Sequence, residues 1–495
     1  MKIEEVLYNH FKFRTFKLGQ KEIISSILDG QHTMAMLPTG TGKSLCYQLP
    51  GYLLKGQVII VSPLLSLMQD QVEQMKIRGE KRVVAINSFL SWPDKRQILN
   101  NLNNYKFIYI SPEMLGLDHV LDRLKRLKIG LFVIDEAHCI SQWGFDFRPE
   151  YRKLGAIREK VGNPLTLALT ATATSDVVRD IVSSLHLEDW KEHIFSVDRP
   201  NISMKVETLN EVLDKQRRVV ELVEYLQGPG IIYFSSKKLA EETAELLKSN
   251  GNRKVMAYHG GLEQESRILI QQQFLKGELD VICATSAFGM GINKEDVRFV
   301  IHYHMPLQIE SYLQEIGRAG RDGEASVAIL LYVPGDEQLP LQLIDNELPS
   351  EAQIDWLFEW MGEHGHSMLA QSEADIRSLA GFTDTQWRLI FDYIINLDLD
   401  QTSLKEGLNN FKIFIQNRNT IKRKKIAEVK NWTQSTECRR EKILKYFDEQ
   451  KKMEITNCCD RCGIQFEQYN KREKLDQEPS FQFHWKDYLS AILKK

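Results

Sequence analysis

Short apolar runs alternate along this chain with longer segments of helical periodicity. The first set of runs, rich in β-branched and aromatic residues, lies at residues 32–37, 58–61, 107–110, 131–134 and 165–169. After a pause near Asp198-Arg199-Pro200-Asn201, a second set follows at 231–234, 254–258, 280–283, 298–303 and 327–332. Such alternation is typical of βαβ units, which build parallel sheets. The pattern predicts two successive α/β domains, at residues 1–200 and 201–335.

Beyond residue 335 helical periodicity replaces the strand pattern, as the spacing of Trp356, Leu357, Trp360 and Met361 shows. Residues 376–387 read as a helix, a glycine turn and a second helix capped by Thr. This pattern fits a helix-turn-helix that reads DNA, and it also fits an ordinary helical hairpin. We expect a helical segment at 336–410 that contains this motif, a second helical module at 411–466 and a C-terminal tail at 467–495.

A strongly basic stretch lies within the second helical module. Seven basic residues between Lys412 and Lys430 are accompanied by one acidic residue, Glu428. Such a run is either a solvated helix face or a surface that follows phosphates, and the sequence leaves both interpretations open.

Composition excludes several classes of protein. The chain has 495 residues, 43% hydrophobic and 26% charged, so it is neither disordered nor collagen-like and has room for roughly three domains. The 64 Lys and Arg against 67 Asp and Glu give a net charge of −3, which excludes a uniformly basic nucleic-acid binder but permits a basic patch. No apolar run approaches the roughly 18 residues of a membrane span, and the first residues lack the order of a secretory signal. We expect a cytoplasmic protein with no membrane partner.

A phosphate-binding loop directly follows the first apolar run. Its residues are Pro38, Thr39, Gly40, Thr41, Gly42, Lys43 and Ser44. The glycines let backbone N–H groups close around phosphates, Lys43 supplies a positive charge, and Ser44 can ligate Mg²⁺ at the start of the next helix. The strict motif has a glycine where this chain has Leu37, but the strand, loop and helix come in the required order. The loop predicts a nucleotide site that uses Mg²⁺.

Two carboxylates follow the run at 131–134, in the string Asp135-Glu136-Ala137-His138. An Asp at the carboxyl end of a buried strand can hold Mg²⁺ through water, and a neighbouring Glu can orient the attacking water. The alternative is an ordinary pair of surface carboxylates. The phosphate loop in the same domain favours the hydrolytic role over this alternative.

Arg318 and Arg321 lie three residues apart in the second domain, in a segment that we expect to be helical, so that both point the same way. Across a cleft from Lys43 they would stabilise charge on the transferred phosphoryl group, as arginine fingers do. A structural salt-bridge pair is the alternative. We favour the finger interpretation, because two α/β domains with one phosphate loop need a partner to complete the site.

Four of the seven cysteines crowd between positions 438 and 462. Cys438, Cys458, Cys459 and Cys462 offer thiolates that suit tetrahedral Zn²⁺, although the adjacent Cys458 and Cys459 depart from the commoner double CxxC spacing. Spacing alone therefore leaves the metal site open. We expect the other three cysteines, Cys46, Cys139 and Cys283, to be buried structural residues.

From about Phe11 to Phe466 the chain resembles the RecQ family of DNA helicases, in particular its short bacterial RecS-like members. The most specific string is DEAHCISQWGFDFRPEY at residues 135–151, and the zinc module of the family begins with the same Cys438-Arg439-Arg440. The resemblance implies two tandem RecA-like domains followed by a mainly helical zinc-binding module. It also implies ATP hydrolysis with Mg²⁺, structural Zn²⁺ and movement 3′ to 5′ along single-stranded DNA.

The same resemblance carries roles over to particular residues. Phe13, Lys17 and Gln20 sit where the family contacts adenine, although the family usually has Arg in place of Lys17. The catalytic set becomes Lys43, Asp135, Glu136, His138, Arg318 and Arg321. Ser62 and Pro63 belong to a segment that resembles one touching the DNA backbone, and residues 169–172 resemble a segment that links DNA to the ATP site.

The aromatic loop after the DEAH string offers Trp143, Phe145, Phe147 and Arg148. Aromatic faces and a cation are suited to holding unpaired bases without reading their sequence, whereas the simpler alternative is ordinary core packing. Phe145 stands where the family typically has His.

These features together predict an ATP-dependent DNA helicase that unwinds duplexes in DNA repair and recombination. An RNA helicase and a DNA-binding protein with a relic ATP site are the alternatives. We expect single-stranded and forked DNA as partners, single-stranded-DNA-binding protein as a candidate protein partner, a monomeric state and association with the nucleoid. Longer members of the family continue into a winged-helix domain, so we expect that function to be absent or supplied by residues 345–408.

Overall fold

The computed structural model describes residues 3–88, 90–141, 148–251, 253–289, 294–365, 368–369, 371–395 and 404–470. Its first domain is built on a parallel sheet of seven strands in the order β3-β4-β2-β5-β6-β1-β7. The strands are β1 (His32–Met36), β2 (Gln57–Val61), β3 (Val83–Ile86), β4 (Phe107–Ile110), β5 (Ile129–Ile134), β6 (Thr166–Thr170) and β7 (Trp190–Ile194). The helices are α1 (Ile3–Phe11), α2 (Gln20–Leu28), α3 (Leu45–Leu53), α4 (Leu65–Ile77), α5 (Trp92–Asn100), α6 (Pro112–Leu115), α7 (Asp118–Leu124), α8 (Pro149–Arg152), α9 (Leu154–Lys160) and α10 (Ser175–Ser184).

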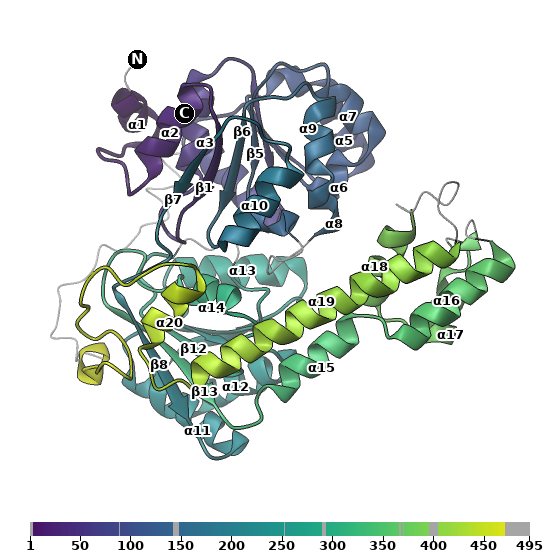
Figure 1. Ribbon diagram of the computed structural model, residues 1–495. Helices are drawn as coiled ribbons and strands as arrows, with labels where there is room; N and C mark the ends of the chain where they lie inside the picture. The colour runs from purple at the N-terminus through teal and green to yellow at the C-terminus, as the bar shows by residue number, and fades with distance from the viewer. Residues whose placement is uncertain are drawn as a thin grey trace.

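The second domain repeats this architecture with a six-stranded parallel sheet in the order β10-β11-β9-β12-β13-β8. The strands are β8 (Ile202–Thr208), β9 (Gly230–Tyr233), β10 (Val255–Tyr258), β11 (Val281–Ala284), β12 (Phe299–His302) and β13 (Ser326–Tyr332). The helices are α11 (Val212–Tyr225), α12 (Lys237–Asn250), α13 (Gln264–Leu275) and α14 (Ile309–Ile316). The two stacked α/β bodies in Figure 1 confirm the predicted fold class.

Sequence reasoning missed three strands, β3, β7 and β8, and each of them lies at an edge of its sheet. An edge strand pairs on one side only and is less enclosed, so β7 and β8 do not carry the continuous apolar run of a central parallel strand. Strand β3 does carry such a run, which sequence reasoning passed over. In β7 the residues are half-buried or exposed throughout.

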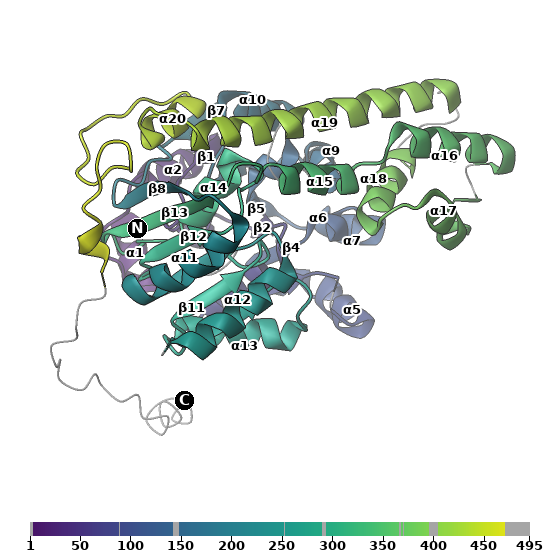
Figure 2. The same ribbon diagram turned by 90° about the horizontal axis from the view of Figure 1, so that it is seen from below.

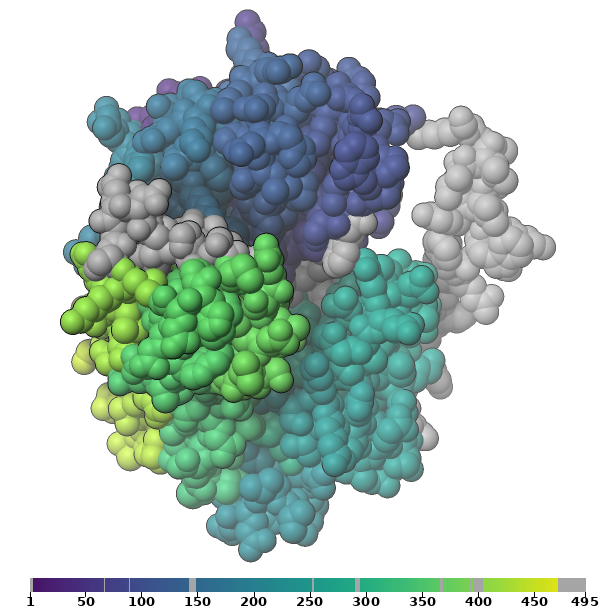
Figure 3. All heavy atoms as spheres, turned by 90° about the vertical axis from the view of Figure 1, so that its right-hand side faces the viewer, coloured from purple at the N-terminus to yellow at the C-terminus, as the bar shows by residue number. Residues whose placement is uncertain are grey.

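The third region is helical, as predicted. It contains α15 (Gln338–Glu347), α16 (Glu351–His364), α17 (Glu373–Ala380), α18 (Asp384–Ile395), α19 (Leu404–Thr433) and α20 (Arg439–Tyr446). The boundary expected between residues 410 and 411 falls inside α19. Figures 1 and 2 show α19 beside α15 and α16, running from the second domain to the end of an extension that α16, α17 and α18 complete. In Figure 3 this extension, in green, lies beside the second domain and below the first.

Ion pairs with other helices engage most of the basic residues of α19. Lys425 reaches Glu310 of α14, Lys430 reaches Glu337, and Lys422 and Arg423 reach two acidic residues of α15. Lys412 pairs with an acidic residue of α16. The basic run is therefore used mainly to fix α19 to α15 and α16 of the helical region, with one contact to the second domain through Glu310. Neither interpretation from the sequence had anticipated this role.

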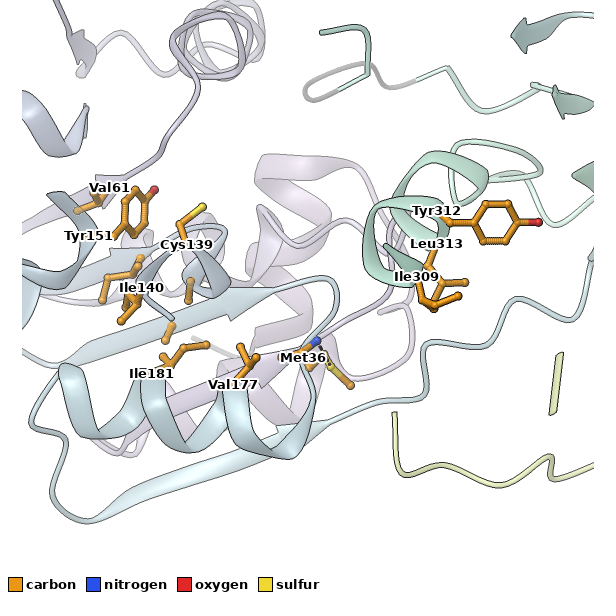
Figure 4. Close-up of a cluster of buried hydrophobic side chains, with 14 of the residues drawn as sticks. Met36, Val61, Cys139, Ile140, Tyr151, Val177, Ile181, Ile309, Tyr312 and Leu313 are labelled. Carbon is orange, nitrogen blue, oxygen red and sulfur yellow. Dashed lines mark hydrogen bonds between the residues drawn. The ribbon is translucent and has the colours of Figure 1, made fainter. Parts of the chain in front are cut away.

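A single hydrophobic cluster crosses the domain boundary and extends into the helical region. Figure 4 shows part of it, with Ile140 and Ile181 from the first domain and Leu313 from α14. Cys46, Cys139 and Cys283 are buried, as expected. Within the part of the chain that the structure describes, no helix is both long and apolar enough to span a bilayer.

We expect Lys425→Ala to lower the free energy of unfolding by about 3–5 kcal/mol, because the buried Glu310 would lose its cation. Arg423→Ala is the matched control and should cost about 0–1 kcal/mol, since both partners of its ion pair are exposed. Denaturant unfolding of both variants measures the difference, and equal effects would contradict a structural role for the buried pair.

Candidate active site and zinc centre

The phosphate loop connects β1 to α3, at the carboxyl edge of the first sheet. Gly40 and Gly42 have φ angles of 86° and 78°, which L side chains adopt only with strain. Gln20 donates from Nε2 to the carbonyls of Thr41 (2.7 Å) and Gly42 (3.2 Å), and Lys17 donates to that of Gly40 (3.3 Å). Lys17 and Gln20, two of the three residues that the resemblance placed near adenine, thus hold the loop itself.

The carboxylates Asp135 and Glu136 follow β5 and are almost fully buried. Glu136 has left-handed backbone (φ 50°), a conformation that costs a non-glycine residue about 1–3 kcal/mol and concentrates at functional sites. Lys43 lies 3.4 Å from its Oε1. Burial and the neighbouring Glu136 raise the pKa of Asp135. Burial acts in the same sense on Glu136, but Lys43 and His138 outweigh it and lower the pKa of that carboxyl.

His138 joins two motifs that are distant in sequence. Its Nδ1 lies 2.9 Å from the hydroxyl of Thr170 at the end of β6 and 3.5 Å from Oε2 of Glu136. A change at residues 170–172 can therefore reach Glu136 through one side chain.

Arg318 and Arg321 are not on a helix, which corrects the expectation from the sequence. Helix α14 ends at Ile316, and the arginines lie in the turn that follows, because Gly317 forms the C-cap and Gly320 has a positive φ of 55°. We call residues 317–321 the arginine turn. Arg318 donates to the carbonyl of Gly289, whereas a Cβ on Gly40 would lie 2.9 Å from Cγ of Arg321. Burial, followed by the charges of Arg318 and Arg199, lowers the pKa of Arg321 to about 9.

A cleft of about 450 Å³ separates the two domains and collects most of these side chains. Lys43, Asp135 and Glu136 line it from the first domain, and Arg318 and Arg321 line it from the second. Phe13 also lines the cleft and is half exposed. The cleft is also lined by six other predicted nucleotide residues, Lys17, Gln20, Thr39, Gly40, Gly42 and Ser44. The predicted Thr41 does not line it, and its hydroxyl donates to the carbonyl of Pro38 (2.8 Å). The geometry can hold a polyphosphate between a lysine and two arginines, with two carboxylates beside it.

The four clustered cysteines meet in space, with their sulfur atoms within 4.8 Å of one another. Cys458 Sγ lies 3.7 Å from Cys438 Sγ, and Cys459 Sγ lies 3.9 Å from Cys438 Sγ and 3.6 Å from Cys462 Sγ. A tetrahedron of thiolates about 2.3 Å from Zn²⁺ has edges of about 3.8 Å, so the donor set fits this ion. The cluster also carries an outer contact, because the backbone N–H of Arg439 donates to Cys459.

Three family profiles match the chain in series. The DEAD/DEAH box helicase profile matches residues 17–181, the helicase conserved C-terminal domain matches 207–323, and the RecQ zinc-binding family matches 405–463. A probable ATP-dependent DNA helicase RecS of Bacillus subtilis (strain 168) is 46% identical over 490 residues, which cover 96% of this chain and 95% of the relative. The chain belongs to the RecQ family.

A second relative and a solved structure match smaller parts of this chain. The ATP-dependent DNA helicase RecQ of Haemophilus influenzae is 41% identical over 67% of this chain, which spans 53% of that relative. The structure of Mycobacterium smegmatis helicase Lhr bound to single-stranded DNA and AMP-PNP shares the fold, with a TM-score of 0.55 and 20% identity over 80% of this chain and 57% of Lhr.

The residues that the RecQ resemblance assigned to DNA are only partly visible. Trp143, Phe145 and Phe147 lie outside the described residues. Ser62 and Pro63 are buried, and Arg148 donates from Nη1 to the carbonyl of Pro63 (2.9 Å). In this arrangement Arg148 ties the start of α8 to the segment after β2, and the side chains of Ser62 and Pro63 do not form an open surface.

The helix, glycine turn and capped helix expected at residues 376–387 are present as α17, Gly381 with a φ of 66°, and α18. The hydroxyl of Thr383 accepts from the N–H of Gln386, as a helix cap does. Residues 351–395 of this RecQ-family chain carry eight acidic side chains against two basic ones, Arg377 and Arg388. Because phosphates repel such a surface, the charge balance favours the ordinary hairpin over a DNA-reading motif.

Arg199 is the main site residue that sequence reasoning missed. Its guanidinium donates to Thr39 in the phosphate loop and to three carbonyls of the arginine turn. The sequence showed only a pause between domains at this arginine, and no local pattern distinguishes it from a surface residue.

We expect Cys462→Ser to reduce bound zinc from about one ion per chain and to lower the melting temperature of the helical module. Cys462 is exposed, so its substitution removes a ligand without removing core packing. Zinc released on denaturation, measured with a chromogenic chelator, and a thermal melt report the two effects. Cys283→Ser is the control for zinc content, because this cysteine lies in β11 outside the cluster and its loss should leave bound zinc unchanged. Full zinc content in Cys462→Ser would contradict the site.

Proposed function

We propose that this RecQ-family protein is an ATP-dependent DNA helicase that moves 3′ to 5′ along single-stranded DNA and unwinds duplexes. The observation that carries the proposal is the interdomain cleft, which gathers Lys43, Asp135 and Glu136 opposite Arg318 and Arg321. The relative RecS, matched over nearly its whole length, is named as a probable ATP-dependent DNA helicase.

The residues of the cleft suggest how hydrolysis would proceed. Lys43 and the backbone N–H groups of residues 39–44 bind the phosphates, and Phe13 lies against the base. Bound Mg²⁺ would supply positive charge at the β- and γ-phosphates, with Ser44 and Asp135 as the side chains suited to hold it. Glu136 orients the attacking water, and the arginine turn stabilises charge on the phosphoryl group as it passes from ADP to that water.

The arrangement of charges in the cleft fits this scheme. Lys43 forms an ion pair with Glu136, and Arg318 and Arg321 lie close enough for their like charges to repel each other. An anion placed between the lysine and the arginines would relieve that repulsion and release Glu136 toward water. ATP therefore exchanges an internal ion pair for contacts from both domains, which couples its binding to closure of the cleft.

DNA sensing would act on the same carboxylate. The contact from Thr170 through His138 to Glu136 joins the segment after β6, which the family uses near DNA, to the water-orienting group. A shift of this segment on DNA would reorient Glu136. We also propose single-stranded and forked DNA as substrates, a role in repair and recombination, action as a monomer in the cytoplasm at the nucleoid, and single-stranded-DNA-binding protein as a partner.

We expect single-stranded DNA to stimulate steady-state ATP hydrolysis strongly. Lys43→Ala and Glu136→Gln should each lower kcat by at least about 100-fold, because they remove phosphate charge and water orientation respectively. Binding of a fluorescent oligonucleotide should be retained in both variants. Lys21→Ala serves as the control, since this lysine forms an exposed ion pair with Glu4.

Two outcomes would redirect the proposal. Stimulation by RNA but not by DNA would favour an RNA helicase. A wild-type protein that binds DNA but hydrolyses no ATP would leave a nucleic-acid-binding protein with a relic ATP site.

The direction of movement has its own test. We expect ATP to drive strand separation of duplexes that carry a 3′ single-stranded tail, and blunt or 5′-tailed duplexes to remain paired. A gel or fluorescence assay with the three substrates and Glu136→Gln as the inactive control measures this. Preferential unwinding of the 5′-tailed duplex would overturn the polarity.

A further inference from the structure

The proposed hydrolysis needs the phosphate loop and the arginine turn at a fixed separation, although each belongs to a different domain. Two side chains bridge them directly. Thr39 donates from its hydroxyl to the carbonyl of Gly317 (3.1 Å), and Arg199 donates from Nη1 to the carbonyls of both Thr39 (3.0 Å) and Gly317 (3.3 Å). Arg199 therefore contacts both halves of the site through a single nitrogen.

The second nitrogen of Arg199 fixes the rest of the turn. Its Nη2 donates to the carbonyls of Ala319 (3.1 Å) and Gly320 (2.6 Å), the two residues that lie between Arg318 and Arg321. A planar guanidinium can satisfy four such acceptors at once, whereas a lysine ammonium is a compact charge without the fork. The contacts are all to main-chain carbonyls, so they set where the backbone of the turn lies.

The two segments also approach too closely for a side chain at the contact. A Cβ on Gly317 would lie 1.9 Å from the hydroxyl oxygen of Thr39. A side chain at residue 317 would therefore push the turn away from the loop.

The backbone of Arg199 is itself anchored by the zinc-binding module. Arg440, which follows the first cysteine of the cluster by two residues, is fully buried and bonds to the carboxylate of Asp198. It also donates to the carbonyls of Arg199 (3.1 Å) and Ile202 (2.5 Å). The linker between the domains is thereby held at the residues on both sides of the bridging guanidinium.

We propose that Arg199 is a positioning residue for ATP hydrolysis, which holds the arginine turn against the phosphate loop. It does not reach into the phosphate site but acts through Arg318 and Arg321. This inference rests on the proposed ATPase and adds the element that sets the geometry between its two halves.

The test compares Arg199→Gln and Arg199→Lys in DNA-stimulated ATP hydrolysis. We expect kcat to fall by about 10- to 100-fold, the usual consequence of a small displacement of catalytic groups, while KM changes by less than about threefold. Lysine should not rescue, because it cannot bridge four carbonyls. In an Arg318→Ala/Arg321→Ala background, Arg199→Gln should cost less than about twofold more, since both groups through which it acts are already gone.

The matched control is Arg158→Gln. Arg158 is also buried and donates to main-chain carbonyls, those of Leu185 (3.4 Å) and His186 (3.3 Å), but it lies within the first domain away from the cleft. A purely structural loss should lower its melting temperature and leave kcat of the folded protein unchanged.

Two further measurements keep the inference decidable. Hydrogen exchange without nucleotide should rise in peptides covering residues 38–44 and 317–321 of Arg199→Gln and stay unchanged there in Arg158→Gln. If Arg199→Gln fails to fold, Gly317→Ala tests the same contact from the other side and should lower kcat at retained KM.

A kcat within twofold of wild type for both Arg199 variants, or a full additional loss in the Arg318→Ala/Arg321→Ala background, would overturn the inference. If wild-type protein hydrolyses no ATP, the proposed function fails, while unchanged exchange in the two peptides separately refutes the bridge.

Discussion

The close approach of Thr39 to Gly317 is the contact on which the geometry of the site depends. It joins the phosphate loop of the first sheet to the turn after α14 of the second, at a distance that leaves no space for a methyl group. The phosphate loop and the Asp135-Glu136 pair lie at the carboxyl ends of parallel strands in the first sheet, which is where α/β sheets place ligand sites. The arginine turn lies between the end of α14 and the start of β13 in the second domain. Where these two parts meet, a lysine, two carboxylates and two arginines share one cleft.

The positive charges on the second-domain side of this cleft repel one another. Arg199, Arg318 and Arg321 bring three positive charges together, and because Arg321 is buried, water screens their repulsion less. On the other side of the cleft, Glu136 has a strained left-handed backbone conformation and forms an ion pair with Lys43. A site of this kind is stabilised by an anion, so the strain and repulsion are consistent with a cleft that closes on a polyphosphate.

The helical region supports the site from behind. Glu310 on α14 receives Lys425 from α19 and the hydroxyl of Tyr446 from α20, and the ring of Tyr312 lies 4.8 Å from that of Trp432. The helix that leads into the arginine turn is thus packed by the same region that carries the cysteine cluster. The other positive charges of α19 largely bind the neighbouring helices α15 and α16, while the acidic hairpin at its far end is poorly suited to phosphates.

The sequence by itself determined the two parallel sheets, the phosphate loop, the Asp135-Glu136 pair and the four cysteines. Each of these depends on local order: a buried parallel strand needs an apolar run, and a phosphate loop needs its glycines beside a strand and a helix. Edge strands such as β7 escaped because half-exposed strands carry no such run. Tertiary structure alone decided that Arg318 and Arg321 leave the helix, that the charges of α19 pair with other helices, and that Arg199 bridges the domains. These outcomes depend on which main-chain carbonyls and carboxylates lie opposite a cation in space, and residues far apart in the chain leave no trace of that in local sequence.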